Sequence, residues 1–286
     1  AQASELEDQT IGSRLTGYTQ ALGQFEDVDS ERDRTGYSSN AYGALGGIDF
    51  RIDDEILAGL ALSYLKTDAD LNDDRGDVDV DTFRFGPYLS VTRERWTFDT
   101  AFAAGFSEFE SKRKMPTLSR TAEGDYDGYD LSGFAQGTWS LLQKDRHRVA
   151  LDGALQYTYF HYDSYEETGA GGANLTMPSN STDSLLGRFG LRYEHRFAEM
   201  AKLVQFELLT GWEHQFLDAD DIKGAFTSGG GRFSINPGGR DDDRWYYGAG
   251  LTMALASRAS LFLHVNGDVS SGSNSVAIGG GFEWTF

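Results

Sequence analysis

The sequence predicts an all-β protein, a closed antiparallel transmembrane β-barrel of about 12 strands with short periplasmic turns and long acidic extracellular loops. Apolar and polar residues alternate with a period of two along successive segments, as they do when the two faces of a strand meet different environments. Short connections between these segments alternate with long ones. The chain is also rich in glycine, with 35 residues, and in aromatic residues, at 13%. Glycine relieves curvature in a barrel, and aromatic side chains form girdles at both water interfaces.

Composition excludes several other classes of protein. No stretch approaches the roughly 18 consecutive apolar residues that a membrane-spanning helix needs. A mean hydropathy of −0.46 still allows spanning strands, because every second residue of such a strand can be polar. The formal charge of −20 argues against a nucleic-acid partner, since phosphate backbones require a basic surface. The absence of cysteine excludes disulfides and thiolate metal sites.

The first six predicted strands occupy roughly the first half of the chain. In the first, residues 13–25, both alternate sets contain apolar residues, so either set could face outward. In the next five, one set is apolar and its alternates are mostly small or polar. The apolar sets, strand by strand, run from Tyr42 to Ile52, from Ala58 to Tyr64, from Phe83 to Val91, from Trp96 to Phe106 and from Tyr129 to Leu141.

The last six predicted strands show a sharper contrast between the two faces. The eighth sets Leu185, Phe189 and Leu191 against arginines and glutamates at the alternate positions. The twelfth ends the chain with an apolar, aromatic face opposite Glu283 and Thr285. The apolar sets run from Val149 to Tyr159, from Leu185 to Phe197, from Val204 to Phe216, from Trp245 to Leu255, from Leu261 to Val265 and from Val276 to Phe286.

The connections give an independent test of the barrel. Those at 53–55, 93–95, 143–147, 198–202 and 257–259 are short, and the intervening ones are mostly longer. The long set carries the acidic clusters at 26–34, 68–81, 123–130, 163–167, 218–221 and 241–243. An even number of strands leaves both ends of the barrel on the periplasmic side. A soluble sandwich, the alternative, would give no reason for the alternation in loop length.

Several segments resemble the translocator β-domain of autotransporters, the type V secretion family of Gram-negative outer membranes. They are NAYGALGGIDFRI (40–52), LAGLALSY (57–64), GRFGLRYEHRF (187–197), YYGAGLTMAL (246–255), SLFLHVNGDV (260–269) and VAIGGGFEWTF (276–286). The resemblance implies a 12-stranded monomeric barrel, in contact with outer-membrane lipid and lipopolysaccharide, that exports and anchors its own N-terminal passenger. It also implies that Phe282, Trp284 and Phe286 form the signal read by the barrel-assembly machinery.

The resemblance divides the chain into an N-terminal linker or short lumen helix at 1–12 and a barrel domain at 13–286. Family barrels are preceded by a helix that crosses the lumen, and only a short segment is available for one here. A stand-alone 12-stranded porin or channel without a passenger is the alternative function. A third hypothesis is that the acidic loops are themselves an adhesive or ion-binding surface.

Ionisable side chains on the predicted inner face are the strongest candidates for function. Such groups are tolerated at membrane depth only where they meet water or each other. They could grip a lumen helix or tune the passage of ions, or they could pair only to rigidify the barrel, and both hypotheses stay open. The predicted lumen-lining charged residues are Arg84, Arg148, Asp152, Arg188, Arg192, Glu194, Arg196, Glu207 and Glu213.

Catalytic and metal sites are not predicted. The five histidines, His147, His161, His195, His214 and His264, form no recognisable constellation with serine or aspartate, so we expect neither an enzyme nor a cofactor. The acidic runs at 218–221 and 241–243 lack the regular spacing of a calcium-binding loop, and we interpret them as solvated extracellular loops.

Overall fold

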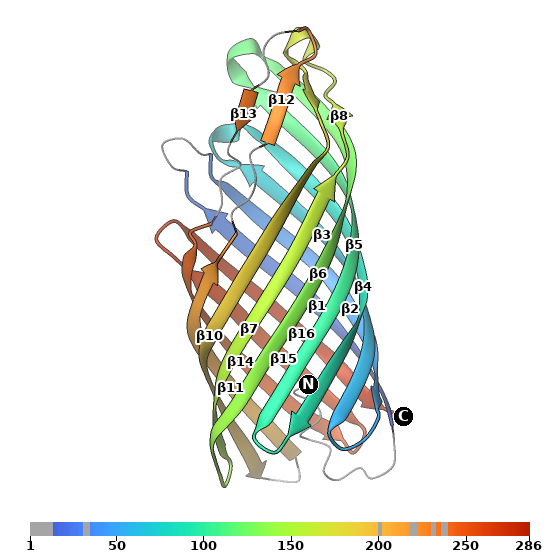
Figure 1. Cartoon of the computed structure of the whole chain (residues 1–286), viewed down its shortest axis with the longest axis vertical. Helices are drawn as coiled ribbons and strands as arrows, with labels where there is room; N and C mark the ends of the chain where they lie inside the picture. Colours follow the sequence, from blue (N-terminus) through green and yellow to red (C-terminus); the bar gives the residue numbers. More distant parts are fainter. Residues whose placement is uncertain (1–13, 31–34, 200–201, 218–221, 230–232, 236–239) are drawn as a thin grey trace.

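The protein is a closed barrel of long tilted strands (Figure 1). The computed structural model describes residues 14–286 except 31–34, 200–201, 218–221, 230–232 and 236–239. Twelve long strands close the barrel within these described residues, which confirms the predicted fold. They are β1 (Leu15–Val28), β2 (Tyr37–Arg51), β3 (Ile56–Leu71), β4 (Gly76–Arg93), β5 (Trp96–Met115), β6 (Arg120–Lys144), β7 (His147–Tyr162), β10 (Asn180–Glu199), β11 (Lys202–Gln215), β14 (Asp243–Ala256), β15 (Ala259–Val269) and β16 (Ser273–Thr285).

The barrel closes where the first strand meets the last. β1 pairs with β16 in an antiparallel register that runs from Thr16 opposite Thr285 to Val28 opposite Ser273. Every other neighbouring pair of barrel strands is antiparallel too. Closure leaves no unpaired strand edge, which is what a hydrocarbon environment requires of a sheet. None of the helices in the described part of the chain is long and apolar enough to span a membrane.

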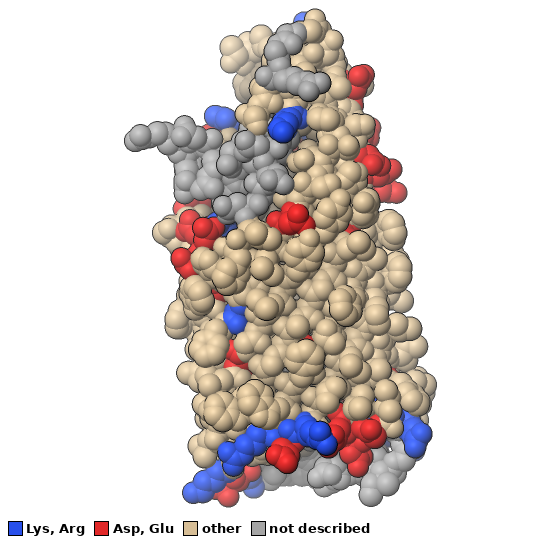
Figure 2. Space-filling model, in the orientation of Figure 1, with Lys and Arg blue, Asp and Glu red and all other residues tan. Residues whose placement is uncertain are grey.

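The two faces of the sheet have opposite character, as the alternation predicts. Large apolar side chains project outward with high exposure, such as Leu60 at 60% and Phe102 at 63%. Figure 2 shows that the middle band of one side is almost free of charged residues, which gather toward both ends. The open question of the first strand is settled: Leu15 and Phe25 are exposed outside, whereas Tyr18 lines a cavity inside.

The two ends of the barrel differ in their connections. We call one the short-turn end, because its described turns are short: 94–95, 145–146 and 257–258 have two residues, and 52–55 has four. At the long-loop end, β3, β4, β5 and β6 continue well past their last outward-facing aromatic residues. β5 and β6 are joined there by η3 (Pro116–Leu118), and β3 and β4 by η2 (Asn72–Asp74). The acidic segments 68–81 and 123–130 therefore lie largely on paired strands and not in loops, while 218–221 lies outside the described residues.

A small second sheet caps the long-loop end (Figure 1). This loop lobe consists of β8 (Tyr165–Glu166), η4 (Gly171–Ala173), β9 (Leu175–Met177), β12 (Ile222–Phe226) and β13 (Phe233–Ile235). Tyr126 of β6 stacks between Phe109 at 4.8 Å and Tyr165 at 4.2 Å between ring centroids. Burial raises the pKa of Tyr165 to about 12.

An ion pair fixes the loop lobe to the end of the β5–β6 hairpin. Arg113 of β5 donates hydrogen bonds to Glu167 at 2.9 Å and to the carbonyl oxygen of Ala173 at 2.9 Å. The bond to Glu167 raises the pKa of the Arg113 guanidinium. The Glu167 carboxylate also accepts the backbone N–H of Leu175 at 2.8 Å. The lobe is thus held on the inner face of the β5–β6 hairpin by both stacking and charge.

Candidate functional site: the barrel lumen

Charged side chains crowd one wall of the lumen, formed by β7, β10, β11 and β14. They come from alternate residues of strands whose other face is apolar, so the pleat alone directs them inward. At the centre, Arg192 bridges two carboxylates. Its Nε lies 3.1 Å from Asp152 Oδ2, and its Nη1 lies 3.0 Å from Glu207 Oε2. The Thr138 hydroxyl donates to the other oxygen of Asp152 at 2.6 Å, so both oxygens of this buried carboxylate have partners.

Nearer the short-turn end, Arg148 and Glu194 face each other across β7 and β10. The Arg148 Nη1 lies 3.1 Å from Glu194 Oε1, and its Nε donates to the Ser140 hydroxyl at 2.7 Å. Arg196, two residues farther along β10, donates to the side-chain oxygen of Gln205 at 3.3 Å. Because each donor meets an acceptor on an adjacent strand, these contacts tie the wall together laterally.

Toward the long-loop end, Glu213 is bound by two arginines. The strand register places Glu213 between Arg188 of β10 and Arg244 of β14. Arg244 Nη2 lies 2.6 Å from Glu213 Oε1, and Arg188 forms an ion pair with the other carboxylate oxygen. Glu213 is only 1% exposed. A carboxylate buried this deeply requires both cations, because an unpaired charge at that depth is costly.

A further group of ion pairs lies at the opening of the long-loop end, which we call the mouth. This group, which we call the clasp, extends the network to the place where β1 pairs with β16. Arg240, which precedes β14, pairs with Asp268 of β15 and lies 3.5 Å from Glu26 of β1 through its Nε. The Tyr37 hydroxyl donates to the same glutamate oxygen at 2.8 Å. Beside them, Asp241 accepts hydrogen bonds from Ser271 and from the N–H of Gly272, and the serine hydroxyl lowers the pKa of Asp241. The clasp therefore spans the junction between the first and last strands.

One predicted residue lies apart from this wall. Arg84 of β4 pairs with Asp130 of β6, with Nη2 and Oδ1 2.9 Å apart, and Asp130 is 1% exposed. All nine predicted residues lie on the inner face, and seven of them form the contacts around Arg148, Arg192 and Glu213. The predicted set of charged lumen residues did not include Asp130, Arg244 and Asp268. Their inward parity was visible in the sequence, but their partners lie on neighbouring strands at a register that no local pattern reveals.

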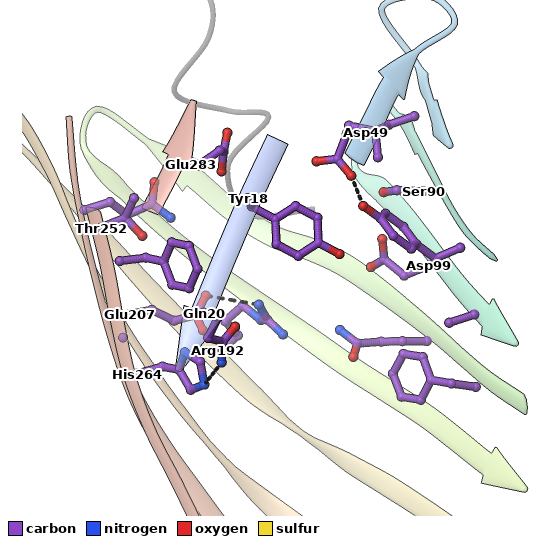
Figure 3. A pocket seen from close by; sticks show the side chains of 18 of the residues that line it. Tyr18, Gln20, Asp49, Ser90, Asp99, Arg192, Glu207, Thr252, His264 and Glu283 are labelled. Carbon is purple, nitrogen blue, oxygen red and sulfur yellow. Dashed lines mark hydrogen bonds and ion pairs between the residues drawn. The ribbon is translucent and has the colours of Figure 1, made fainter. Parts of the chain in front are cut away.

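A cavity of about 540 Å³ occupies the half of the lumen nearer the short turns (Figure 3). We call it the acidic chamber; its charged lining residues are Asp49, Asp99, Glu207, Glu283 and Arg192. Tyr18 of β1 and Tyr88 of β4 both line it, with their ring centroids 6.4 Å apart. The Tyr88 hydroxyl donates to Asp49, and the side chains of Gln20 and His264 lie 3.1 Å apart.

A second cavity of about 390 Å³ lies toward the mouth. Its charged lining consists of Asp152, Asp268, Arg188, Arg192 and Arg240. Gln136 and Arg192 line both cavities, so the two spaces adjoin at the middle of the barrel. Polar, partly charged walls of this kind hold water, and their side chains decide what can occupy the lumen.

The predicted C-terminal signal lies on the outer face at the short-turn end. Phe282, Trp284 and Phe286 are exposed by 52%, 38% and 58%. The Phe286 N–H donates to the carbonyl oxygen of Leu15 at 3.0 Å, so the last residue is joined to the start of β1. The three side chains form an aromatic strip that an external partner can reach.

Comparison with known proteins gives consistent matches. The Autotransporter beta-domain family model matches residues 17–266. The fold is similar to the translocator domain of NalP from Neisseria meningitidis, at 14% identity and a TM-score of 0.79 over 99% of this chain and 92% of that one. It is also similar to the β domain of BrkA from Bordetella, at 17% identity and a TM-score of 0.73 over 96% of this chain and 100% of that one.

A longer relative also matches by sequence. Esterase EstA of Pseudomonas aeruginosa is 22% identical over 273 residues, which cover 88% of this chain and 40% of that protein. The chain spans less than half the length of the curated relatives it matches first.

Proposed function

Because the chain belongs to the Autotransporter beta-domain family, we propose that it exports an N-terminal passenger and anchors it at the cell surface. It is a translocator barrel of the Gram-negative outer membrane. The observation that carries the proposal is a polar lumen, with two adjoining cavities, inside a barrel whose outer band is apolar. A polypeptide attached before β1 could cross the membrane through such a space without meeting lipid.

The position of β1 supports this route. Its described residues start at Leu15, at the short-turn end, and its neighbour β16 ends there too. We propose that this end is periplasmic, so that both barrel ends face the periplasm. A passenger fused before residue 13 would then enter the lumen at the short-turn end, from the periplasm. The predicted linker or lumen helix at 1–12 lies outside the described residues.

The charged wall has a role in this proposal. Arg188 is the most open of its arginines, with a side chain 44% exposed toward the lumen. The segment 1–12 carries Glu5, Glu7 and Asp8 and no basic residue. We expect Arg188 and its neighbours to hold that acidic segment by charge, while the pairs around Arg192 keep the wall rigid.

The remaining roles follow from the outer surface. The aromatic strip of Phe282, Trp284 and Phe286 would be read by the barrel-assembly machinery, and the apolar band and acidic extensions would meet lipid and lipopolysaccharide. We expect a monomer without catalytic activity or cofactor. The esterase named among the relatives is a longer protein, and this chain matches 40% of it.

A stand-alone channel is the second candidate, favoured by the two cavities that share Gln136 and Arg192. Planar-bilayer conductance separates the two functions. A large, steady current from the intact chain would favour the channel. A current that appears only after residues 1–12 are deleted would favour a translocator whose lumen is occupied.

Export itself can be tested by fusing a small protease-sensitive reporter before Ala1 and expressing the fusion in a Gram-negative host. Protease added to whole cells should cleave the reporter while the barrel keeps its heat-modifiable migration. A reporter that stays protected in intact cells with a folded barrel would contradict export.

A further inference from the structure

Charge is distributed unequally along the lumen. The acidic chamber is lined by four carboxylates and one guanidinium, a formal charge of −3. The cavity toward the mouth is lined by two carboxylates and three guanidiniums, a formal charge of +1. Both cavities lie in the same tube, so an ion that crosses the barrel meets the two regions in sequence.

The charges of the two regions also differ in how they are compensated. Toward the mouth, Arg188, Arg192 and Arg240 each form an ion pair with a carboxylate of the barrel wall. In the acidic chamber the Arg192–Glu207 contact is the one ion pair between described residues. Asp49, Asp99 and Glu283 form no ion pair with the residues that the structure describes, and Arg51 of β2 compensates the charge of Glu283 only from a distance.

These three carboxylates come from three strands in one half of the barrel wall. Asp49 lies on β2, Asp99 on β5 and Glu283 on β16. Figure 3 shows Glu283 on one side of the Tyr18 ring and Asp49 and Asp99 on the other. Arg51, two residues beyond Asp49 on the same face of β2, does not line the cavity. The three carboxylates therefore line one arc of the chamber wall, from β16 across β1 and β2 to β5.

A partial ring of carboxylates in a narrow, low-dielectric tube attracts cations and repels anions. The arginines toward the long-loop end oppose this effect less than their number suggests, because each forms an ion pair with a carboxylate of the barrel wall. We propose that the acidic chamber is a cation-selectivity site, at which inorganic cations and small organic amines concentrate while anions are excluded. This inference shares with the proposed function only the water-filled, membrane-spanning lumen, and it does not depend on a passenger.

The reversal potential of the full-length chain in a planar bilayer under a KCl gradient tests the proposal. We expect potassium to be favoured over chloride by several-fold. The variant Asp49→Asn/Asp99→Asn/Glu283→Gln should bring the permeability ratio close to one. Spermine, a polyvalent amine, should block the unmodified protein and block the triple variant at least ten-fold more weakly.

A matched control removes the same number of carboxylates outside the lumen. Asp68, Asp79 and Glu110 form one cross-strand row on the outward face of β3, β4 and β5 at the long-loop end. The variant Asp68→Asn/Asp79→Asn/Glu110→Gln should leave selectivity unchanged. An equal loss of selectivity in this control would overturn the proposal, because it would trace the effect to net charge and not to the chamber.

Other outcomes are equally decisive. Anion selectivity, an unchanged ratio in the chamber variant, or no current from either the full chain or the chain lacking residues 1–12 would overturn the proposal.

Should the triple variant lose its heat-modifiable fold, Asp99→Asn and Glu283→Gln are tested singly, each with a partial loss of selectivity expected. Surface display of the fused reporter should not change in the chamber variant. Lost display with retained selectivity would contradict passenger export alone.

Discussion

The ring of Tyr88 lies directly over the backbone of Gly59, its cross-strand partner on β3. A Cβ added at Gly59 would lie 2.2 Å from Tyr88 Cζ, a distance that no relaxed contact allows. Glycine here is a requirement of packing, since it lets the ring settle against the wall and direct its hydroxyl to Asp49. The position of Tyr88 in the acidic chamber therefore depends on the lack of a side chain at Gly59.

Replacement of Gly59 by alanine should therefore destabilise the barrel by about 1–3 kcal/mol, because the ring must leave its position. Urea unfolding in lipid vesicles, followed by tryptophan fluorescence, measures the change. Gly137→Ala is the matched control, since a Cβ there meets nothing within 4 Å. Equal effects of both substitutions would contradict the packing argument.

Glu213→Gln should cost about 3–5 kcal/mol of stability, because it leaves Arg188 and the nearly buried Arg244 without their shared counter-ion. The same urea experiment applies. Glu108→Gln, on the outer face of β5, should change stability by less than about 0.5 kcal/mol. Adding Arg244→Met to Glu213→Gln should restore part of the loss, and no restoration would argue against a charge-pair origin.

Deletion of Phe286 should slow assembly far more than it weakens the folded barrel. The folded state loses an exposed ring and one hydrogen bond to Leu15, worth about 0.5–1.5 kcal/mol. Insertion into vesicles that contain the barrel-assembly machinery gives the rate, and urea unfolding gives the stability. Phe286→Tyr keeps an aromatic ring and should assemble normally. Proportionate losses of rate and stability on deletion would refute a recognition role.

The loop lobe should open in alkali before the barrel unfolds. The pKa of Tyr165 is raised to about 12 by burial, whereas an unfolded tyrosine titrates near about 10. A raised folded-state pKa means that this contribution to stability is fully present below about pH 10 and is lost as the pH rises toward 12. Burial also raises the pKa of Tyr126, which stacks on Tyr165.

Protease cleavage of the lobe between about pH 9 and about pH 12, with strand content followed by circular dichroism, measures this opening. The variant Tyr126→Phe/Tyr165→Phe should remove most of the pH dependence of cleavage. Cleavage that rises with pH equally in this variant would contradict the assignment to these two phenols.

The sequence alone predicts the faces of the strands well and their ends poorly. Alternation reports which solvent a side chain meets, so from the second strand to the twelfth the apolar sets lie outside as expected. In β1 the outward residues include Gly17, Thr19 and Ala21, and the inward set includes Tyr18 and Leu22, so hydrophobicity could not decide. The face of β1 that points inward is set by packing in the closed barrel, because Tyr18 contacts the Tyr88 ring in the lumen.

The acidic segment 68–81 shows a different limit. Its charges suggest a loop, but Asp77, Asp79 and Asp81 alternate with Val78 and Val80, which is a strand pattern. Pairing with β3 and β5 then carries the sheet beyond the apolar band. The acidic chamber was not predicted for another reason. Asp49, Asp99 and Glu283 are far apart in sequence, and the curvature of a closed tube brings them around one space.

The clasp at the mouth has a consequence for the order of events in folding. Arg240 touches Glu26 near the start of the chain and Asp268 near its end, and β16 runs between the strands that carry them. Neither half of the molecule can offer both carboxylates by itself. The Arg240 guanidinium can contact both carboxylates only after β1 has paired with β16. Formation of these two ion pairs therefore reports that the inserted sheet has closed into a barrel.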